Sequence, residues 1–408
     1  MTLRRYRVPG RIEFLGKHTD YAGGRSLICA TEQGFSVRAT ERTDPVLRIV
    51  DQASGESAEL PLRSDLEIPA GSWVAYPATV ARRLARDFGP LTVGLDLSFT
   101  SDLPRDAGVS SSSALVVAVG VAVADANRLP KQPDWLAVIP DRQALAGYLG
   151  AVENGLGFGP FQPDGGVGTR GGSQDHTAIL CAEPGMLLQY GFDPVRFERA
   201  VPLPAGHQLV VAVSGVVAAK SGAAMGKYNA LAQDAQRLIF LWGKKTWAND
   251  RTLFDALASG PTAAADLRNC LVGEPDEVRL ANRLDQFNAE CFEIIPAVGD
   301  LLLRGVVSGL GELVDRSQQG AERGLANQVP ETVHLQRSAR RLGAIAASAF
   351  GAGFGGSVWA LAPEEGSAEF AAGWEEDYLV TFPEQKGQAR FFRTAAGGPA
   401  RTAVEKSG

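Results

Sequence analysis

The chain has 408 residues, of which 40 are basic and 46 acidic, giving a formal net charge of −6. At roughly 100 to 200 residues per domain, this length predicts two or three cores and excludes one small module. Binding to DNA or RNA needs a dense positive surface, so the acidic balance argues against a nucleic-acid partner. Hydrophobic residues make up 45% of the chain and there are 47 glycines, which predicts a globular protein with many glycine turns.

The four cysteines are spaced in a way that fits neither a disulfide framework nor a zinc site. The N-terminal segment is charged and lacks the apolar stretch of a signal peptide, and no apolar run is long enough to cross a membrane. We therefore expect a cytoplasmic protein with no membrane partner.

Changes in hydrophobic period locate the elements. Apolar residues alternate with polar ones from 91 to 99, which predicts a half-buried strand. A polar loop follows, and then residues 114–127 are apolar on nearly every face, as in a buried helix. Further expected strands are 11–15, 209–213 and 389–394, and further expected helices are 73–88, 223–242, 276–295 and 333–347. A turn-rich stretch near residue 205 suggests two domains, 1–205 and 206–408.

The loop between the strand and the buried helix is rich in glycine and serine, and includes Gly108, Ser110, Ser111 and Ser112. The N-terminus of a helix offers free backbone N–H groups and the positive end of the helix dipole, so the loop is a candidate anion site. Serine hydroxyls also suit Mg²⁺, a hard cation that prefers oxygen ligands. The loop lacks the lysine of a Walker A motif, and the alternative is an ordinary helix cap with redundant serines.

The N-terminal segment carries five consecutive hydrogen-bonding side chains, from Lys17 to Tyr21. Such a mixture of donors and acceptors suits a sugar ring, whose hydroxyls both donate and accept. The alternative is a solvated turn, and a lone histidine such as His18 most often has a structural role.

Two glycine-rich segments complete the set of candidates. Asp175 follows Gly171 and Gly172 and precedes an apolar run, so it is a candidate buried base, or simply the cap of the next helix. The glycines at 350–356 either let the backbone approach a ligand or form a tight helix-to-strand turn.

In this order the segments GRIEFLGKHTDY, PRDAGVSSSSA, GGSQDH and GAGFGG resemble the motifs of the GHMP small-molecule kinases, and HTDY resembles the galactokinases. The resemblance runs from Pro9 to about Leu361. It implies an α+β fold of two domains, an N-terminal ribosomal S5 domain 2-like domain and a C-terminal ferredoxin-like domain, with the active site between them. It also implies ATP-dependent phosphorylation of a monosaccharide at its anomeric hydroxyl, with ATP and Mg²⁺ as cofactors.

The resemblance also implies roles for individual residues. The loop from Pro104 to Ser112 corresponds to the phosphate loop, with Ser112 contacting the metal and Glu153 completing the Mg²⁺ site. Arg11 would lie beside the transferring phosphoryl group, and Asp175 at the anomeric hydroxyl. Other sugar contacts would come from the segment after the first strand and from two distant residues, namely Lys17, His18, Asp20, Gly172 and Tyr228.

The sequence departs from the family pattern at several of these positions. Glu13 replaces an asparagine, Ser113 replaces an alanine, and GGSQDH replaces CGxxDQ, which leaves His176 as a supporting or core residue. An insertion before Asp175 weakens the assignment of Glu153 as a metal ligand.

Lys17 stands where galactokinases have a glutamate. Because lysine only donates, we expect Lys17 to shift preference away from plain galactose, toward an acidic sugar or one with an altered C6 substituent, unless it turns outward to solvent. Two other functions stay open: a kinase for a uronic acid, a heptose or another sugar, and a sensor that binds sugar and ATP without catalysis. The sequence leaves the particular sugar and the oligomeric state open.

Overall fold

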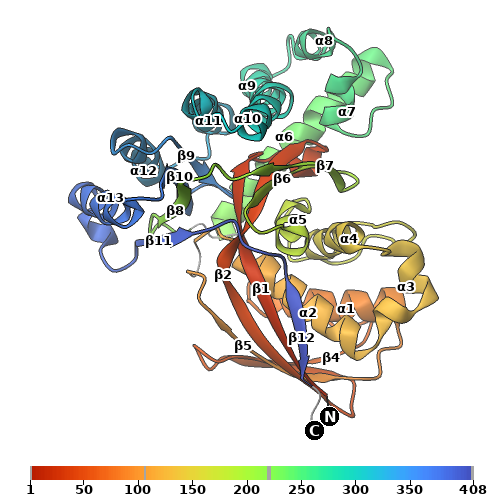
Figure 1. Cartoon of the computed structure of the whole chain (residues 1–408). Helices are drawn as coiled ribbons and strands as arrows, with labels where there is room; N and C mark the ends of the chain where they lie inside the picture. The colour runs from red at the N-terminus through yellow and green to blue at the C-terminus, as the bar shows by residue number, and fades with distance from the viewer. Residues whose placement is uncertain (1, 105–106, 218–221, 406–408) are drawn as a thin grey trace.

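A computed structural model describes residues 2–104, 107–217 and 222–405, so Arg105 and Asp106 of the serine loop lie outside the described residues. The larger sheet runs in the order β12-β1-β2-β5-β3-β4, and β6 extends it by pairing with β2 and with β7. The long curved strands β1 and β2 form its centre (Figure 1). Its strands are β1 Leu3–Leu15, β2 Arg25–Glu41, β3 Val46–Asp51, β4 Ser57–Pro61, β5 Leu95–Ser101, β6 Met186–Gly191, β7 Arg196–Pro202 and β12 Arg401–Glu405.

The second sheet is antiparallel, in the order β11-β8-β10-β9. Its strands are β8 His207–Val213, β9 Ala346–Phe350, β10 Ser357–Pro363 and β11 Arg390–Thr394. Helices α12 and α13 pack on it, and α11 packs against β9.

One group of helices covers the larger sheet, with α1, α2 and α5 in contact with its strands and α4 packed on these helices, and a second group follows β8 (Figure 1). The first group is α1 Ala75–Phe88, α2 Ser111–Ala126, α3 Pro133–Val138, α4 Arg142–Asn154 and α5 Gln174–Cys181. The second is α6 Gly222–Thr246, α7 Leu253–Ala258, α8 Ala263–Asn269, α9 Glu277–Asn288, α10 Ile295–Leu303, α11 Leu310–Gln319, α12 Pro330–Arg341 and α13 Ser367–Thr381, with π-helical turns at Ala289–Ile294 and Gly320–Leu325.

Helix α2 is buried because it is apolar on almost every side, and it lies against β1, β2, α1, α4 and α5. One hydrophobic core extends from the larger sheet to one face of the second sheet, and a separate core lies between the other face of the second sheet and helices α12 and α13. At their junction the rings of Phe14 on β1 and Trp359 on β10 stack with centroids 4.0 Å apart. The ends of the strands that carry candidate site residues are therefore held rigidly between the sheets.

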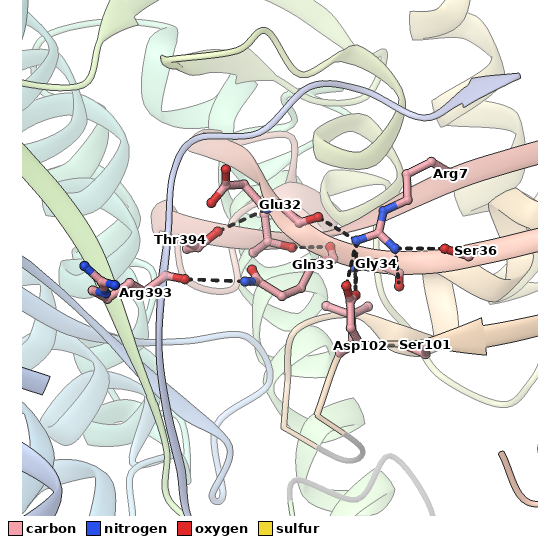
Figure 2. Close-up of polar contacts among 11 residues, drawn as sticks. Arg7, Glu32, Gln33, Gly34, Ser36, Ser101, Asp102, Arg393 and Thr394 are labelled. Carbon is pink, nitrogen blue, oxygen red and sulfur yellow. Dashed lines mark hydrogen bonds and ion pairs between the residues drawn. The ribbon is translucent and has the colours of Figure 1, made fainter. Parts of the chain in front are cut away.

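Near the start of the serine loop, polar contacts link strands of the larger sheet to one another and, at Glu32, to the second sheet (Figure 2). Asp102, just after β5, accepts a hydrogen bond from Arg7 at 2.9 Å and another from the backbone N–H of Gly34. On the other side, the backbone N–H of Glu32 donates to Thr394 of β11 at 3.0 Å. These bonds fix the point at which the chain leaves β5 toward the loop.

Most expected elements are confirmed, with shifted ends. The strand expected at 91–99 begins at Leu95, and the helix expected at 333–347 ends at Arg341, because the chain then enters the buried strand β9. The glycine segment 350–356 consequently joins two strands and is not a helix-to-strand turn.

The C-terminal strand β12 pairs antiparallel with β1, so both ends of the described chain lie in the larger sheet (Figure 1). We keep the division near residue 205 as a proposal, with β12 assigned to the first domain. All four cysteines are free. In the part of the chain that the structure describes, no helix has the length and apolar character of a membrane span.

Candidate active site

Two depressions meet at Arg11 on β1, which lines both of them. One is a polar cavity of about 40 Å³, called here the polar cavity, whose walls include β1, the turn after β1, α4, α5 and Tyr228 of α6. The other is a groove of about 320 Å³, called here the serine groove, lined by Ser110, Ser111 and Ser112. The strand-loop-helix unit and the N-terminal motif thus adjoin one another.

Arg11 is almost completely buried and connects the two depressions. Its Nε donates to Oδ1 of Asp175 at 2.7 Å, and its Nη1 donates to the carbonyl oxygen of Gly108 in the serine loop. Asp175 lies in the first turn of α5, and its Oδ2 is 3.5 Å from Oγ of Ser113. Residues 164 positions apart in sequence therefore form one charged pair at the boundary between cavity and groove.

The turn after β1 contributes His18 and Asp20 to the polar cavity. Nδ1 of His18 is 3.0 Å from the hydroxyl of Tyr21, and Nε2 is 3.1 Å from the carbonyl oxygen of Ala352. Tyr228 lies across the cavity, with its ring centroid 5.3 Å from that of His18. Burial, followed by the charge of Asp20, raises the pKa of Tyr228 well above its usual range, so its hydroxyl remains a donor at neutral pH.

Gly172 lines the cavity at a position where a larger side chain would collide with Asp20. A Cβ atom at this position would lie 2.4 Å from Oδ2 of Asp20, the same oxygen that accepts the backbone N–H of Gln174 at 3.1 Å. The glycine lets Asp20 bond to the N-terminus of α5.

Glu153 of α4 is buried in the wall of the same cavity. Its Oε2 accepts a hydrogen bond from Oγ of Ser113 at 3.0 Å and lies 3.0 Å from Nε2 of His176, although that ring is not aligned for a hydrogen bond. The insertion after Glu153 does not move this residue away from Asp175. Ser113 and His176, which depart from the family pattern, line the polar cavity. Ser112 lines the serine groove.

Backbone conformation shapes the serine groove. Gly108 and Ser110 have positive φ values of 70° and 63°, a region that favours glycine and is strained for serine. Among the described residues, the buried Oγ of Ser110 has no hydrogen-bond partner. Trp73 and Phe99 line the same groove, and no sequence motif marked these two aromatic residues.

The glycine segment after β9, which belongs to the second sheet, lies against the serine loop and Arg11. A Cβ at Gly351 would lie 3.0 Å from the carbonyl oxygen of Gly108 and 3.2 Å from Nη2 of Arg11. The backbone therefore approaches the serine loop closely at this point.

Lys17 does not lie where the sequence suggested. It lines neither depression, and it does not turn outward to solvent either, because it is only 2% exposed. Its ammonium donates to Oγ of Ser317 at 2.9 Å and to Oγ of Ser348 at 2.8 Å. Ser317 in turn donates to the buried Glu290, which also accepts the backbone N–H of Gly16. The lysine joins the turn after β1 to α11 and β9 instead of facing a substrate.

Glu13, a departure from the family pattern, does line the polar cavity. Its Oε2 accepts a hydrogen bond from Nε2 of Gln174 at 2.7 Å. Burial raises the pKa of Glu13 from 4.5 to about 7, although the charges of Arg11 and Lys17 act in the opposite direction.

Three family models match the chain. They are the GHMP kinases N terminal domain at residues 75–156, the galactokinase galactose-binding signature at 4–40, and the GHMP kinases C terminal domain at 299–377. A galactokinase from Chloroflexus aggregans is 27% identical over 92% of this chain and 87% of its own, and one from Streptomyces coelicolor is 27% identical over 88% and 84%.

Two solved structures share the fold. A galactokinase from Lactococcus lactis complexed with galactose matches with a TM-score of 0.80 and 21% identity, over 98% of this chain and 95% of its own. A mevalonate kinase from Methanococcus jannaschii matches with a TM-score of 0.58 and 14% identity, over 97% and 98%.

The chain therefore shares its two-sheet fold with these kinases, and its sequence is similar to the GHMP kinases in the two segments that the family models match. Its N-terminal segment is similar to the galactose-binding signature of the galactokinases.

Proposed function

We propose that the protein transfers the γ-phosphoryl group of ATP to the anomeric hydroxyl of a monosaccharide. The observation that carries this proposal is the position of Arg11, which bonds to Asp175 in the polar cavity and to Gly108 of the serine loop. A phosphoryl group on the loop and a sugar in the cavity would meet at this arginine. A sensor without catalysis would not need this pair at the boundary between its two ligands.

In this reaction the anomeric oxygen attacks the γ-phosphorus, the bond to the ADP oxygen breaks, and the hydroxyl proton passes to the carboxylate of Asp175. Arg11 holds this carboxylate in position and offsets negative charge that develops on the transferring group. The hydroxyls and amide groups of Gly108, Ser110 and Ser111 would bind the phosphates.

Magnesium would neutralise charge on the phosphates, and its preference for oxygen fits the hydroxyl of Ser112 and the carboxylate of Glu153. Mg²⁺ usually keeps waters and phosphate oxygens, so one or two protein ligands suffice. The aromatic rings of Trp73 and Phe99 would accommodate the base of the nucleotide, since both line the serine groove.

For the sugar, His18, Asp20 and Tyr228 offer donors and acceptors around the polar cavity. Tyr228 and Ala352 lie outside the larger sheet and its helices, so both halves of the chain contribute to the wall of the cavity.

The test is an ADP-release assay with neutral hexoses, pentoses, heptoses and uronic acids, followed by ³¹P NMR of any product. We expect sugar-dependent ADP release and an anomeric phosphate. Asp175→Asn serves as the matched control, because it keeps the shape of the side chain without the base. ADP release that no sugar stimulates, or a phosphate on another carbon, would contradict the proposal.

A further inference from the structure

The cavity contains a buried acceptor that no described residue satisfies. Glu13 follows Arg11 by two positions on β1, and both side chains line the polar cavity. Glu13 is 3% exposed, and only Oε2 is bonded, through Gln174. Among the described residues, Oε1 has no hydrogen-bond partner.

The partner of Oε2 is itself fixed, so Glu13 has little freedom to find another donor. Oε1 of Gln174 accepts from Oγ of Ser26 at 2.6 Å, which orients the amide so that its Nε2 faces Glu13. A buried oxygen without a donor is costly, and folded proteins rarely keep one without a reason. In a cavity that suits a polyhydroxyl molecule, the reason is a donor that arrives with the ligand.

We propose that Glu13 determines sugar specificity, with its Oε1 accepting a hydrogen bond from one hydroxyl of the bound sugar. This inference rests on the proposed function and concerns a hydroxyl other than the one that is phosphorylated, since Asp175 receives that one. Glu13 would thereby provide the sugar contact that the sequence assigned to Lys17. The ammonium of Lys17 is instead bonded to Ser317 and Ser348.

The charges of the cavity narrow the substrate class. Glu13, Asp20, Glu153 and Asp175 all line it, whereas Arg11 is its one permanently charged cation among the described lining residues. A carboxylate on the sugar would lie among these acidic groups, with Arg11 on the cavity wall and the buried Lys17 behind Glu13 as the nearby cations. The site therefore selects a neutral sugar and disfavours a uronic acid.

The test compares the wild type and Glu13→Gln at pH 8, where Glu13 is ionised and its Oε1 is an acceptor, with the best neutral sugar and its monodeoxy analogues. The glutamine keeps an oxygen for Nε2 of Gln174 and turns an NH₂ group toward the position of Oε1, so an acceptor becomes a donor. In the wild type, we expect the loss of one particular hydroxyl to lower kcat/KM at least about tenfold. In Glu13→Gln the same deletion should change kcat/KM by less than about threefold, while the other deletions act equally on both proteins.

Glu290→Gln is the matched control, because Glu290 is also a buried carboxylate close to Lys17 but does not line the cavity. It should leave all the ratios as they are in the wild type. If every deletion costs the wild type and Glu13→Gln the same factor, Glu13 does not contact the sugar and acts only through Gln174. A wild type that prefers a uronic acid to the neutral sugar would overturn the inference as well.

Calorimetric binding of the same sugars without nucleotide separates this inference from the proposed function. If sugars bind and are phosphorylated, but removal of each hydroxyl has the same effect on the wild type and on Glu13→Gln, only the inference about Glu13 is refuted. If no sugar binds or is phosphorylated, the proposed function itself is refuted. If Glu13→Gln unfolds at a lower temperature than the assay allows, Glu13→Asp takes its place. Aspartate keeps the acceptor but moves it back by one methylene. It must reduce the ratio of kcat/KM between the intact sugar and the same single deoxy analogue.

Discussion

Replacing Glu13 with glutamine should stabilise the protein more at pH 8 than at pH 5. The folded state raises the pKa of this carboxyl from 4.5 to about 7, mainly by burial, and therefore holds its proton more tightly than the unfolded chain does. The stability contributed by a raised pKa is fully present below pH 4.5 and is lost as the pH rises through about 7.

The size of the effect follows from these two pKa values. Between pH 5 and pH 8 the unfolded chain releases the proton over most of the range while the folded protein retains it until about pH 7. Integration at 1.36 kcal/mol per pH unit gives a loss of about 2.5 kcal/mol for the wild type over this interval. Glutamine does not titrate, so Glu13→Gln escapes this loss while keeping the bond from Gln174.

The assay is urea unfolding of both proteins at pH 5 and pH 8. Groups common to the two proteins cancel in the difference, so the free energy of unfolding of Glu13→Gln minus that of the wild type should rise by about 2.5 kcal/mol between the two pH values. A difference that stays constant or falls would show that Glu13 is already ionised in the folded protein at pH 5, and the reasoning from burial would be wrong.

Three further changes test the site. Asp175→Asn should lower turnover by a factor of about 10² to 10⁴ and leave ATP binding intact, as measured by steady-state kinetics and calorimetry; wild-type turnover at saturating sugar would contradict the role of Asp175. Ser112→Ala should raise the Mg²⁺ concentration needed for half-maximal activity while the KM for sugar changes little, whereas an unchanged Mg²⁺ titration would show that Ser112, in the first turn of α2, does not bind the metal. Lys17→Met should cost about 1 to 3 kcal/mol of stability, because two buried serines lose their donor, but should preserve the ratio of kcat/KM for galactose and galacturonate. A changed ratio would show that Lys17 does influence the choice of sugar.

The candidate site could be predicted from the sequence wherever a local motif carries it. Gly108 and the serines after it precede an apolar run, and that run becomes the buried helix α2 as expected. Asp175 follows two glycines, and it lies in the first turn of α5 beside Arg11. These motifs work because backbone conformation and helix termini depend on neighbouring residues.

Contacts between distant residues could not be predicted in the same way. Ser113 had no assigned role, yet it donates to Glu153 in the cavity wall. His176, which was expected to be a supporting or core residue, is buried beside the same carboxylate. The insertion before Asp175 weakened the assignment of Glu153 as a metal ligand. Phe161 of this insertion instead packs on Phe88 with ring centroids 5.0 Å apart, and Glu153 stays at the site.

The sequence by itself determined the periodic elements, the order of the motifs and the acidic balance of the chain. Only the tertiary structure decided which side chains face the cavity. Lys17 and Glu13 lie four residues apart, yet one bonds to Ser317 and Ser348, 300 and 331 positions away, and the other lines the cavity. The reason is physical: a buried polar side chain lies where its hydrogen-bond partners are, and those partners come from strands and helices that meet only in the fold.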